Sequence, residues 1–244
     1  MNTAYLRFEF RTLLRNRGLL VTAVVVPVAM YALNAHQPNG AIGGIRWPLF
    51  FLGSMTAYAA IAAALYVAPT IATERASGWV QQLRVTPLPA SRYVTTKLAT
   101  AVALTVPATL LMLLEGTALT SIHPATAAAL LAVATIGGLP FAGLAISVGY
   151  LLTPRTTQLA MSGLVLGLAF LGGLFMPLPA LPSIVRPVVT VLPSHHLAQL
   201  CRAVVANRAL PIRSVLALAA WTVTTFATAA WLYRQDRTTP ASTA

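Results

Sequence analysis

The chain has 244 residues, of which 57% are apolar and 8% charged, whereas soluble domains carry about 25% charged residues. This composition excludes a soluble globular domain, which could not cover its surface with so few charges, and a disordered chain, which would be poor in apolar residues. The net charge of +12 would suggest nucleic acid in a soluble protein, but most basic residues here flank apolar segments. We therefore assign them to an anionic membrane surface, expect membrane lipids and no nucleic acid as partners, and predict an all-α membrane protein.

Six apolar segments are candidates for spanning helices, each of which needs about 20 apolar residues to cross a bilayer. They cover approximately residues 19–33, 47–72, 98–119, 126–152, 158–176 and 215–232. The first extends to Ala35, and we interpret it as an uncleaved span because Pro27 lies inside it and the residues before Ala35 form a poor cleavage site. Together the six segments form a single transmembrane domain over residues 1–244.

The basic residues give the orientation, because arginine and lysine are enriched in the cytoplasmic loops of membrane proteins. Most of the 16 basic residues lie inside when both termini are cytoplasmic. The exceptions are Arg46, Arg186, Arg202, Arg208 and Arg213. The preference for arginine over lysine, together with abundant alanine, is typical of a GC-rich bacterial genome. We therefore predict a multi-pass protein of the bacterial plasma membrane with both termini in the cytoplasm.

The sequence before the first segment is amphipathic. One stripe of a helix over residues 1–17 would carry apolar side chains, and the neighbouring stripe would carry arginines. The apolar stripe contains Leu6, Phe10, Leu13 and Leu14, and the basic stripe contains Arg7, Arg11 and Arg15. A helix of this kind lies in the membrane interface. It would be either a plain anchor or a collar that frames the docking surface of a partner.

The predicted cytoplasmic segment 74–87 has an apolar face at helical spacing, formed by Ala76, Trp79, Val80 and Leu83. Glu74 suits the positive N-terminal end of a helix, and the pair Thr86-Pro87 ends it, because a residue before proline avoids the helical region. The pattern predicts a short amphipathic helix, which would either lie in the membrane interface or dock on a partner.

This segment resembles the coupling region of the type-2 ATP-binding-cassette (ABC) permease family, in which Glu-Arg-Glu-x-Gly-Thr precedes a leucine and a Ser/Thr-Pro. The matching residues are Glu74, Arg75, Gly78, Leu83, Thr86 and Pro87, whereas Ala76 and Trp79 depart from the pattern. The resemblance implies a coupling helix on a separate ABC ATPase. Its apolar residues Trp79, Val80 and Leu83 would enter a groove on that subunit, with Glu74 and Arg75 at the groove's edge.

Residues 177–213 are largely apolar, but prolines divide them into pieces too short to span a bilayer. Such backbone is tolerated at membrane depth only when it is buried against protein or lines a cavity. We therefore predict two short re-entrant helices that seal the outer mouth, and the segment is similar to the extracellular re-entrant region of the same family. The residues assigned to this outer gate are Pro177, Pro182, Pro193, His195, His196 and Arg202.

Three further features have two interpretations each. Glu115 is the only acid inside an apolar segment, and it lies either at the level of the outer headgroups or in contact with a cationic substrate. Gly163 and Gly167 pack either within the chain or against a second subunit. His195 and His196 would point to different faces of a helix, so we expect an interfacial or gate role and no metal.

The sequence has no G-x-x-x-x-G-K-[ST] phosphate loop, so it cannot bind and hydrolyse ATP in that way. The resemblance implies an ABC exporter in which two copies, or this chain and a related permease, pair with separate ATPases. Those ATPases hold ATP and Mg²⁺, and this chain carries no cofactor and no catalytic centre. In its short length and lack of soluble domains, the chain is most similar to the drug-resistance branch of the family. The resemblance implies an amphiphilic drug or antibiotic, a lipid or a glycan-lipid as substrate.

Two other functions stay open at this point. One is a membrane scaffold or assembly protein without transport. The other is an intramembrane hydrolase, because residues 160–163 resemble the serine motif of rhomboid proteases, although the last apolar segment has no histidine to act as base.

Overall fold

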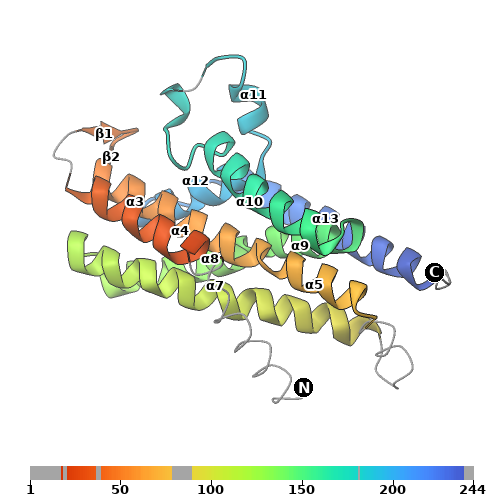
Figure 1. Cartoon of the computed structure of the whole chain (residues 1–244). Helices are drawn as coiled ribbons and strands as arrows, with labels where there is room; N and C mark the ends of the chain where they lie inside the picture. Colours follow the sequence, from red (N-terminus) through yellow and green to blue (C-terminus); the bar gives the residue numbers. More distant parts are fainter. Residues whose placement is uncertain (1–17, 19–20, 37–39, 79–89, 181, 239–244) are drawn as a thin grey trace.

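The computed structural model describes residues 18, 21–36, 40–78, 90–180 and 182–238, which form an elongated bundle of helices with one small hairpin at an end (Figure 1). Within this part of the chain, four helices are long and apolar enough to cross a membrane, and they cover Trp47–Ala76, Thr95–Thr120, Pro124–Leu151 and Ile212–Gln235. The predicted all-α membrane class is thereby confirmed. The predicted interfacial helix, residues 1–17, and residues 79–87 of the predicted coupling helix lie outside the described residues.

The other two predicted spans are shorter helices. The first apolar segment forms a π-helical stretch, η1 (Val21–Val25), which continues into α3 (Val26–Ala35). The fifth forms α10 (Pro154–Leu171), whose first turn is polar and carries Arg155. A topology of six complete spans therefore stays a prediction.

Two of the long helices are interrupted near a proline. The second apolar segment forms α4 (Trp47–Leu65) and α5 (Val67–Ala76), and Pro69 lacks the N–H that would bond to the carbonyl of Leu65. The fourth forms α8 (Pro124–Gly137) and α9 (Leu139–Leu151), with Pro140 just after the break. The third forms the continuous helix α7 (Ala90–Thr120).

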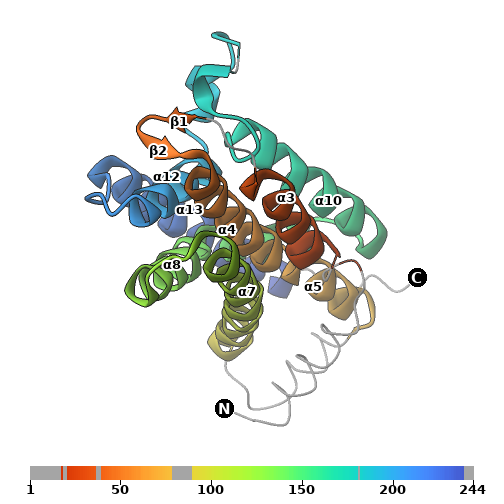
Figure 2. The same ribbon diagram turned by 90° about the vertical axis from the view of Figure 1, so that its left-hand side faces the viewer.

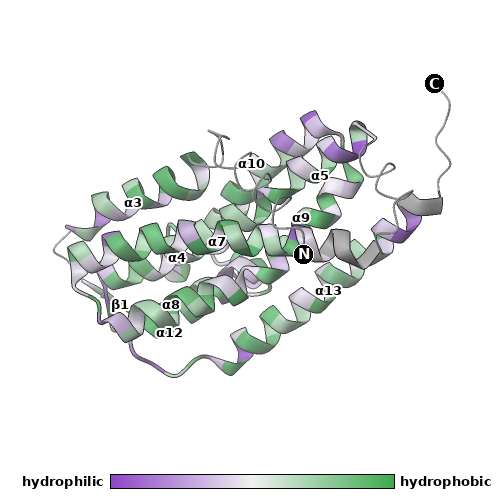
Figure 3. Ribbon diagram, turned by 90° about the horizontal axis from the view of Figure 1, so that it is seen from below, coloured by the Kyte–Doolittle hydropathy of each residue, from purple (hydrophilic) through white to green (hydrophobic). Residues whose placement is uncertain are grey.

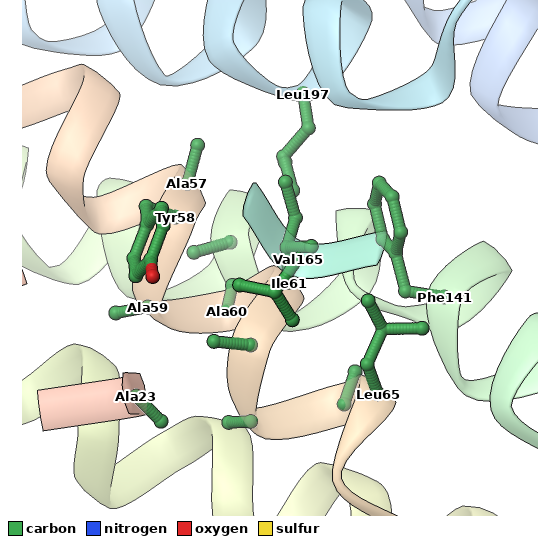
Figure 4. Close-up of a cluster of buried hydrophobic side chains, with 14 of the residues drawn as sticks. Ala23, Ala57, Tyr58, Ala59, Ala60, Ile61, Leu65, Phe141, Val165 and Leu197 are labelled. Carbon is green, nitrogen blue, oxygen red and sulfur yellow. The ribbon is translucent and has the colours of Figure 1, made fainter. Parts of the chain in front are cut away.

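Helix α4 lies at the centre of the bundle, where α3, α7, α8 and the later helix α12 (Pro193–Val205) surround it (Figure 2). Its alanines allow these neighbours to approach closely, and its side chains from Phe50 to Leu65 are all buried. In Figure 4, Phe141 of α9, Val165 of α10 and Leu197 of α12 lie around the alanine-rich stretch of α4. The core of the protein is therefore this helix, whose side chains from Phe50 to Leu65 are covered on every face by the rest of the chain.

The remaining elements are a small hairpin at one end of the bundle and the helices that follow α10. Strands β1 (Ala41–Ile42) and β2 (Ile45–Arg46) pair antiparallel around Gly43 and Gly44, whose positive φ angles of 58° and 74° suit a tight hairpin turn. After α10 come the short helices η2 (Leu178–Ala180) and α11 (Arg186–Val189), then α12, and last α13 (Ile212–Thr238).

The loops gather at two opposite ends of the bundle, and strongly hydrophilic residues lie toward both of these ends (Figure 3). One end holds the hairpin, the turn from α7 to α8 and the loop from α12 to α13. The opposite end holds the end of α5, the start of α7, the turn from α9 to α10 and the end of α13 (Figure 1). Following the predicted orientation, we call the first the outer end and the second the cytoplasmic end.

Candidate functional site

The described part of the predicted coupling segment is its first five residues, at the end of α5. The carboxylate of Glu74 accepts a hydrogen bond from Nζ of Lys97 in α7, with 2.5 Å between the two atoms. The side chain of Lys97 is completely buried and that of Glu74 is 20% exposed. This ion pair joins the residue before the cytoplasmic loop to a residue after it.

The neighbouring Arg75 binds a different helix. Its Nη1 atom donates hydrogen bonds to the carbonyl oxygens of Gly149, at 3.2 Å, and Tyr150, at 2.5 Å. These carbonyls belong to the last turn of α9, where the negative end of the helix dipole attracts a cation. The guanidinium carbon also lies 5.2 Å from the ring centroid of Tyr150, and that ring meets Tyr233 of α13 edge-on.

Gly78, the last described residue before the loop, has the left-handed backbone conformation that glycine favours. Its φ angle is +72°, and its N–H donates to the carbonyl of Arg75. The sequence placed Glu74 and Arg75 at the edge of a groove on another subunit, whereas the structure has both side chains bound to helices of the same chain. We name Glu74, Arg75, Lys97, Tyr150 and Tyr233 the cytoplasmic cluster.

Sequence reasoning missed Lys97, Tyr150 and Tyr233. Lys97 was counted only as one more basic residue on the cytoplasmic side, although it is the single lysine of the sequence. That was the available signal, because a lysine among arginines marks a position where a compact point charge is used. The two tyrosines are apolar residues in helical segments, and nothing in the pattern separates them from ordinary core residues.

The outer-gate residues do not form one site. Pro177 and Pro182 belong to the excursion between α10 and α12, which stands away from the bundle in both views (Figures 1 and 2). Pro193 opens α12 and is buried, as is His195. His196 lies near α13, with its Nδ1 3.2 Å from the hydroxyl of Ser214. The described residues contain no group of three or more His, Cys, Asp or Glu that could hold a metal ion.

Arg202 is the outer-gate residue with the most contacts. Its Nε and Nη2 atoms donate to the hydroxyl oxygen of Ser54 in α4, at 2.9 and 2.8 Å, and Nη2 also donates to the carbonyl of Gly173, just after α10. The guanidinium carbon lies 3.9 Å from the ring centroid of Phe50. Arg202 thus fastens α12 to the central helix and to the end of α10.

The two predicted re-entrant helices differ in burial. Helix α12 packs against α4, α8 and α13, as backbone at membrane depth requires. In contrast, the excursion around α11 exposes 84% of Ile184, 54% of Val188 and 63% of Val191. In the single chain, therefore, only α12 is buried against protein.

Glu115 lies on the outer half of α7. One of its carboxylate oxygens, Oε2, is buried without a hydrogen-bond partner in the described part of the chain. Close by, the hydroxyl of Tyr31 in α3 lies 2.9 Å from that of Thr120. These contacts do not test whether Glu115 binds a cationic substrate, which stays a prediction.

Gly163 and Gly167 lie on an open face of α10. A Cβ atom at either position would meet nothing within 4 Å, and the neighbouring Leu159, Leu166 and Phe170 are 70%, 48% and 54% exposed. Of the two interpretations given for these glycines, packing against another described helix of the chain does not fit this geometry.

Comparison with known proteins adds the family. The family model described as ABC-2 family transporter protein matches residues 17–231. The chain is also similar to the "Putative transport permease YvfS" of Bacillus subtilis (strain 168), with 25% identity over 192 residues that cover 77% of this chain and 78% of that protein. The match to the family model begins before η1 and extends through most of α13, so this chain belongs to the ABC-2 family of transporter proteins and is a multi-pass membrane permease.

Proposed function

We propose that this chain is the permease subunit of an ATP-driven exporter, and that residues 74–87 couple it to a separate ABC ATPase. The family and the sequence motif support this assignment. The observation that carries it is the cytoplasmic cluster, in which two adjacent residues at the base of the loop bind α7 and α9. A loop anchored on several helices can pass a displacement from a docked subunit to the membrane.

ATP and Mg²⁺ belong on the partner in this proposal, because the sequence has no phosphate-binding loop of the G-x-x-x-x-G-K-[ST] type. Nucleotide binding would close the ATPase pair, and the cytoplasmic loop would follow that movement. The substrate would then leave on the outer side of the bacterial plasma membrane.

A second permease, either another copy or a related chain, completes the transporter. The central helix α4 is covered on every side from Phe50 to Leu65 within one chain, which favours a substrate path between two chains over one along this helix. The open, small-residue face of α10 around Gly163 and Gly167 suits close contact with a second chain. We expect the substrate on such a path to be an amphiphilic drug or antibiotic, a lipid or a glycan-lipid. If it is cationic, the carboxylate of Glu115, whose Oε2 has no hydrogen-bond partner in the described chain, could bind its charge.

Affinity purification from the native host in mild detergent tests the proposal. We expect the wild-type chain to bring down an ABC ATPase. Trp79→Ala and Leu83→Asp should weaken this association about 30-fold, since loss of one large interface anchor costs about 2 kcal/mol. Trp231→Ala is the matched control, because Trp231 of α13 is 56% exposed on a different helix and should not affect ATPase binding.

The outcomes separate the competing functions. Normal ATPase binding by Leu83→Asp would show that residues 74–87 do not dock on the ATPase. Purification of the wild-type chain with other membrane proteins but no ATPase would favour a scaffold over a transporter.

A further inference from the structure

An ion pair between described residues closes the base of the cytoplasmic loop between α5 and α7. Glu74 precedes the loop and Lys97 follows it, 23 positions later. The Lys97 side chain is completely buried, so its ammonium group needs an anion or several oxygen atoms in place of water. The sequence has only four acidic residues, and among those that the structure describes Glu74 forms an ion pair with this lysine. The two ends of the loop are therefore held together by charge.

The next residue, Arg75, binds the same end of α5 to a different helix, α9. It donates to two carbonyls at the C-terminus of α9, and the Tyr150 ring below it meets Tyr233 of α13 with 5.8 Å between ring centroids. Arg75 thus connects α5 to α9 directly and to α13 through Tyr150.

The backbones of α5 and α9 also touch, which leaves little freedom for the two helices to slide. A Cβ atom on Gly149 would lie 2.9 Å from the carbonyl oxygen of Ala68 and 2.9 Å from Cβ of Ile71. The interior of a packed helix pair transmits strain, because it has no voids in which to absorb a shift.

We propose that Lys97 and Tyr150 are positioning residues for ATPase coupling, which hold the base of the cytoplasmic loop so that α5, α7, α9 and α13 move as one unit. This inference rests on the proposed function, and it changes the role of Glu74 and Arg75. They act within the chain, on the membrane side of the loop, and the ATPase is contacted by other residues of the loop.

Exchanging the charges of the ion pair distinguishes this role from a contact with the ATPase. We expect Glu74→Lys and Lys97→Glu each to lower transporter-linked ATP hydrolysis about tenfold, within the range for residues that couple two sites. The ATPase should still co-purify with each variant. The double exchange, Glu74→Lys with Lys97→Glu, should restore most of the activity, because the pair is rebuilt with its charges reversed. Arg155→Glu is the control for Lys97→Glu, since it makes the same change of charge at an exposed position of the cytoplasmic end and should leave ATP hydrolysis unchanged.

A distance measurement tests the same inference without ATPase or substrate. Spin labels at Ser77→Cys and Thr95→Cys, in a Cys201→Ala background, lie on the two sides of the loop base, and both positions are exposed. The distribution of label-to-label distances should be narrow in the purified chain, broad in Glu74→Lys and narrow again in the double exchange. A neutral pair, Glu74→Gln with Lys97→Met, avoids a buried unpaired charge and should fold but give the broad distribution.

The outcomes distinguish a failure of this inference from a failure of the proposed function. If single exchanges abolish ATPase co-purification and the double exchange does not restore it, Glu74 contacts the ATPase, which overturns this inference and supports the proposed function. If no ATPase co-purifies with the wild-type chain, the proposed function fails, and the distance distributions alone then decide whether Lys97 holds the loop base. Narrow distributions in every variant would show that the ion pair does not position the loop.

Discussion

Arg202 of α12 donates two hydrogen bonds to the hydroxyl of Ser54 in α4, a residue 148 positions earlier in the sequence. The same guanidinium binds the carbonyl of Gly173, so a single side chain joins three elements near the outer end of the bundle. All of these partners are neutral. A guanidinium can use several of its N–H groups at once in a fixed plane, and this explains why arginine suits the position.

Replacement of Arg202 by lysine should destabilise the protein. The ammonium group would keep the charge but could not make the planar set of bonds to Ser54 and Gly173, and we expect a loss of about 2 kcal/mol, the scale of a hydrogen bond to a charged group. Ser54→Ala should have a similar effect. The two substitutions should be non-additive by about 0.5–3 kcal/mol, because they remove one shared interaction. Thermal unfolding in mild detergent measures all four proteins, and strict additivity would show that the contact carries no energy.

The helical class and the approximate positions of the helices were predictable, because apolar segments of spanning length leave few alternatives. The predicted second segment begins at Trp47, and so does α4. The breaks at Tyr66 and Gly138 were not predicted, although Pro69 and Pro140 mark them. A hydropathy pattern shows where a chain is apolar, and it does not show how the backbone relieves the missing hydrogen bond of a proline.

The contacts of the cytoplasmic cluster could not be predicted, for a different physical reason. Counting basic residues assigns a side of the membrane, and it cannot tell a buried ion pair such as Lys97 with Glu74 from an exposed charge. The exposure of α11 was missed because its apolar residues suggested burial within one chain, whereas apolar residues can equally face lipid or another subunit.

The orientation of the protein has a direct test. Single cysteines at Ser77 and Gln235 should be protected from an impermeant thiol reagent on intact cells, and one at Asn39 should be labelled, all in a Cys201→Ala background. The excess of basic residues on the predicted inner side is the physical reason. Labelling of Ser77→Cys on intact cells, with Asn39→Cys protected, would show that the protein has the opposite orientation.

The open face of α10 should serve self-association or pairing with a related permease. Because nothing in the described chain lies within 4 Å of a Cβ at Gly163, Gly163→Leu should not destabilise the isolated chain, and the higher helix propensity of leucine should stabilise it by up to about 1 kcal/mol. It should nevertheless weaken the permease pair, which cross-linking in native membranes would measure. Leu216→Ala, at an exposed position on α13, is the control. Undiminished cross-linking in Gly163→Leu would place the subunit contact elsewhere.

The excursion between α10 and α12 should meet lipid or a second permease rather than water. Spin labels at Ile184 and Val188, which are exposed in the single chain, should be accessible to oxygen and poorly accessible to a water-soluble relaxation agent. A label at Val189, which is buried, should be accessible to neither. This alternation would follow one face of a helix. High water access along the whole segment would mean a simple exposed loop, and a role in closing the outer mouth would be excluded.

The closeness of α4 and α12 should make Gly53 intolerant of even one added carbon. A Cβ atom there would lie 3.0 Å from the backbone nitrogen of Arg202 and 3.1 Å from its Cα, and backbone atoms cannot move aside as the end of a side chain can. Gly53→Ala must therefore push α12 away from α4 and stretch the bonds between Arg202 and Ser54.

Two opposing effects decide the size of this change. Alanine favours a helix over glycine by about 1 kcal/mol, whereas overpacking a buried contact costs about 1–3 kcal/mol. We expect Gly53→Ala to be destabilising and Gly167→Ala, where the new Cβ meets nothing within 4 Å, to be neutral or stabilising in the isolated chain. Gly137→Ala should fall between them, because its Cβ would meet the flexible end of Leu197. Thermal unfolding of the three variants in one detergent gives the order, and equal stability of Gly53→Ala and Gly167→Ala would mean that α4 and α12 are not in backbone contact.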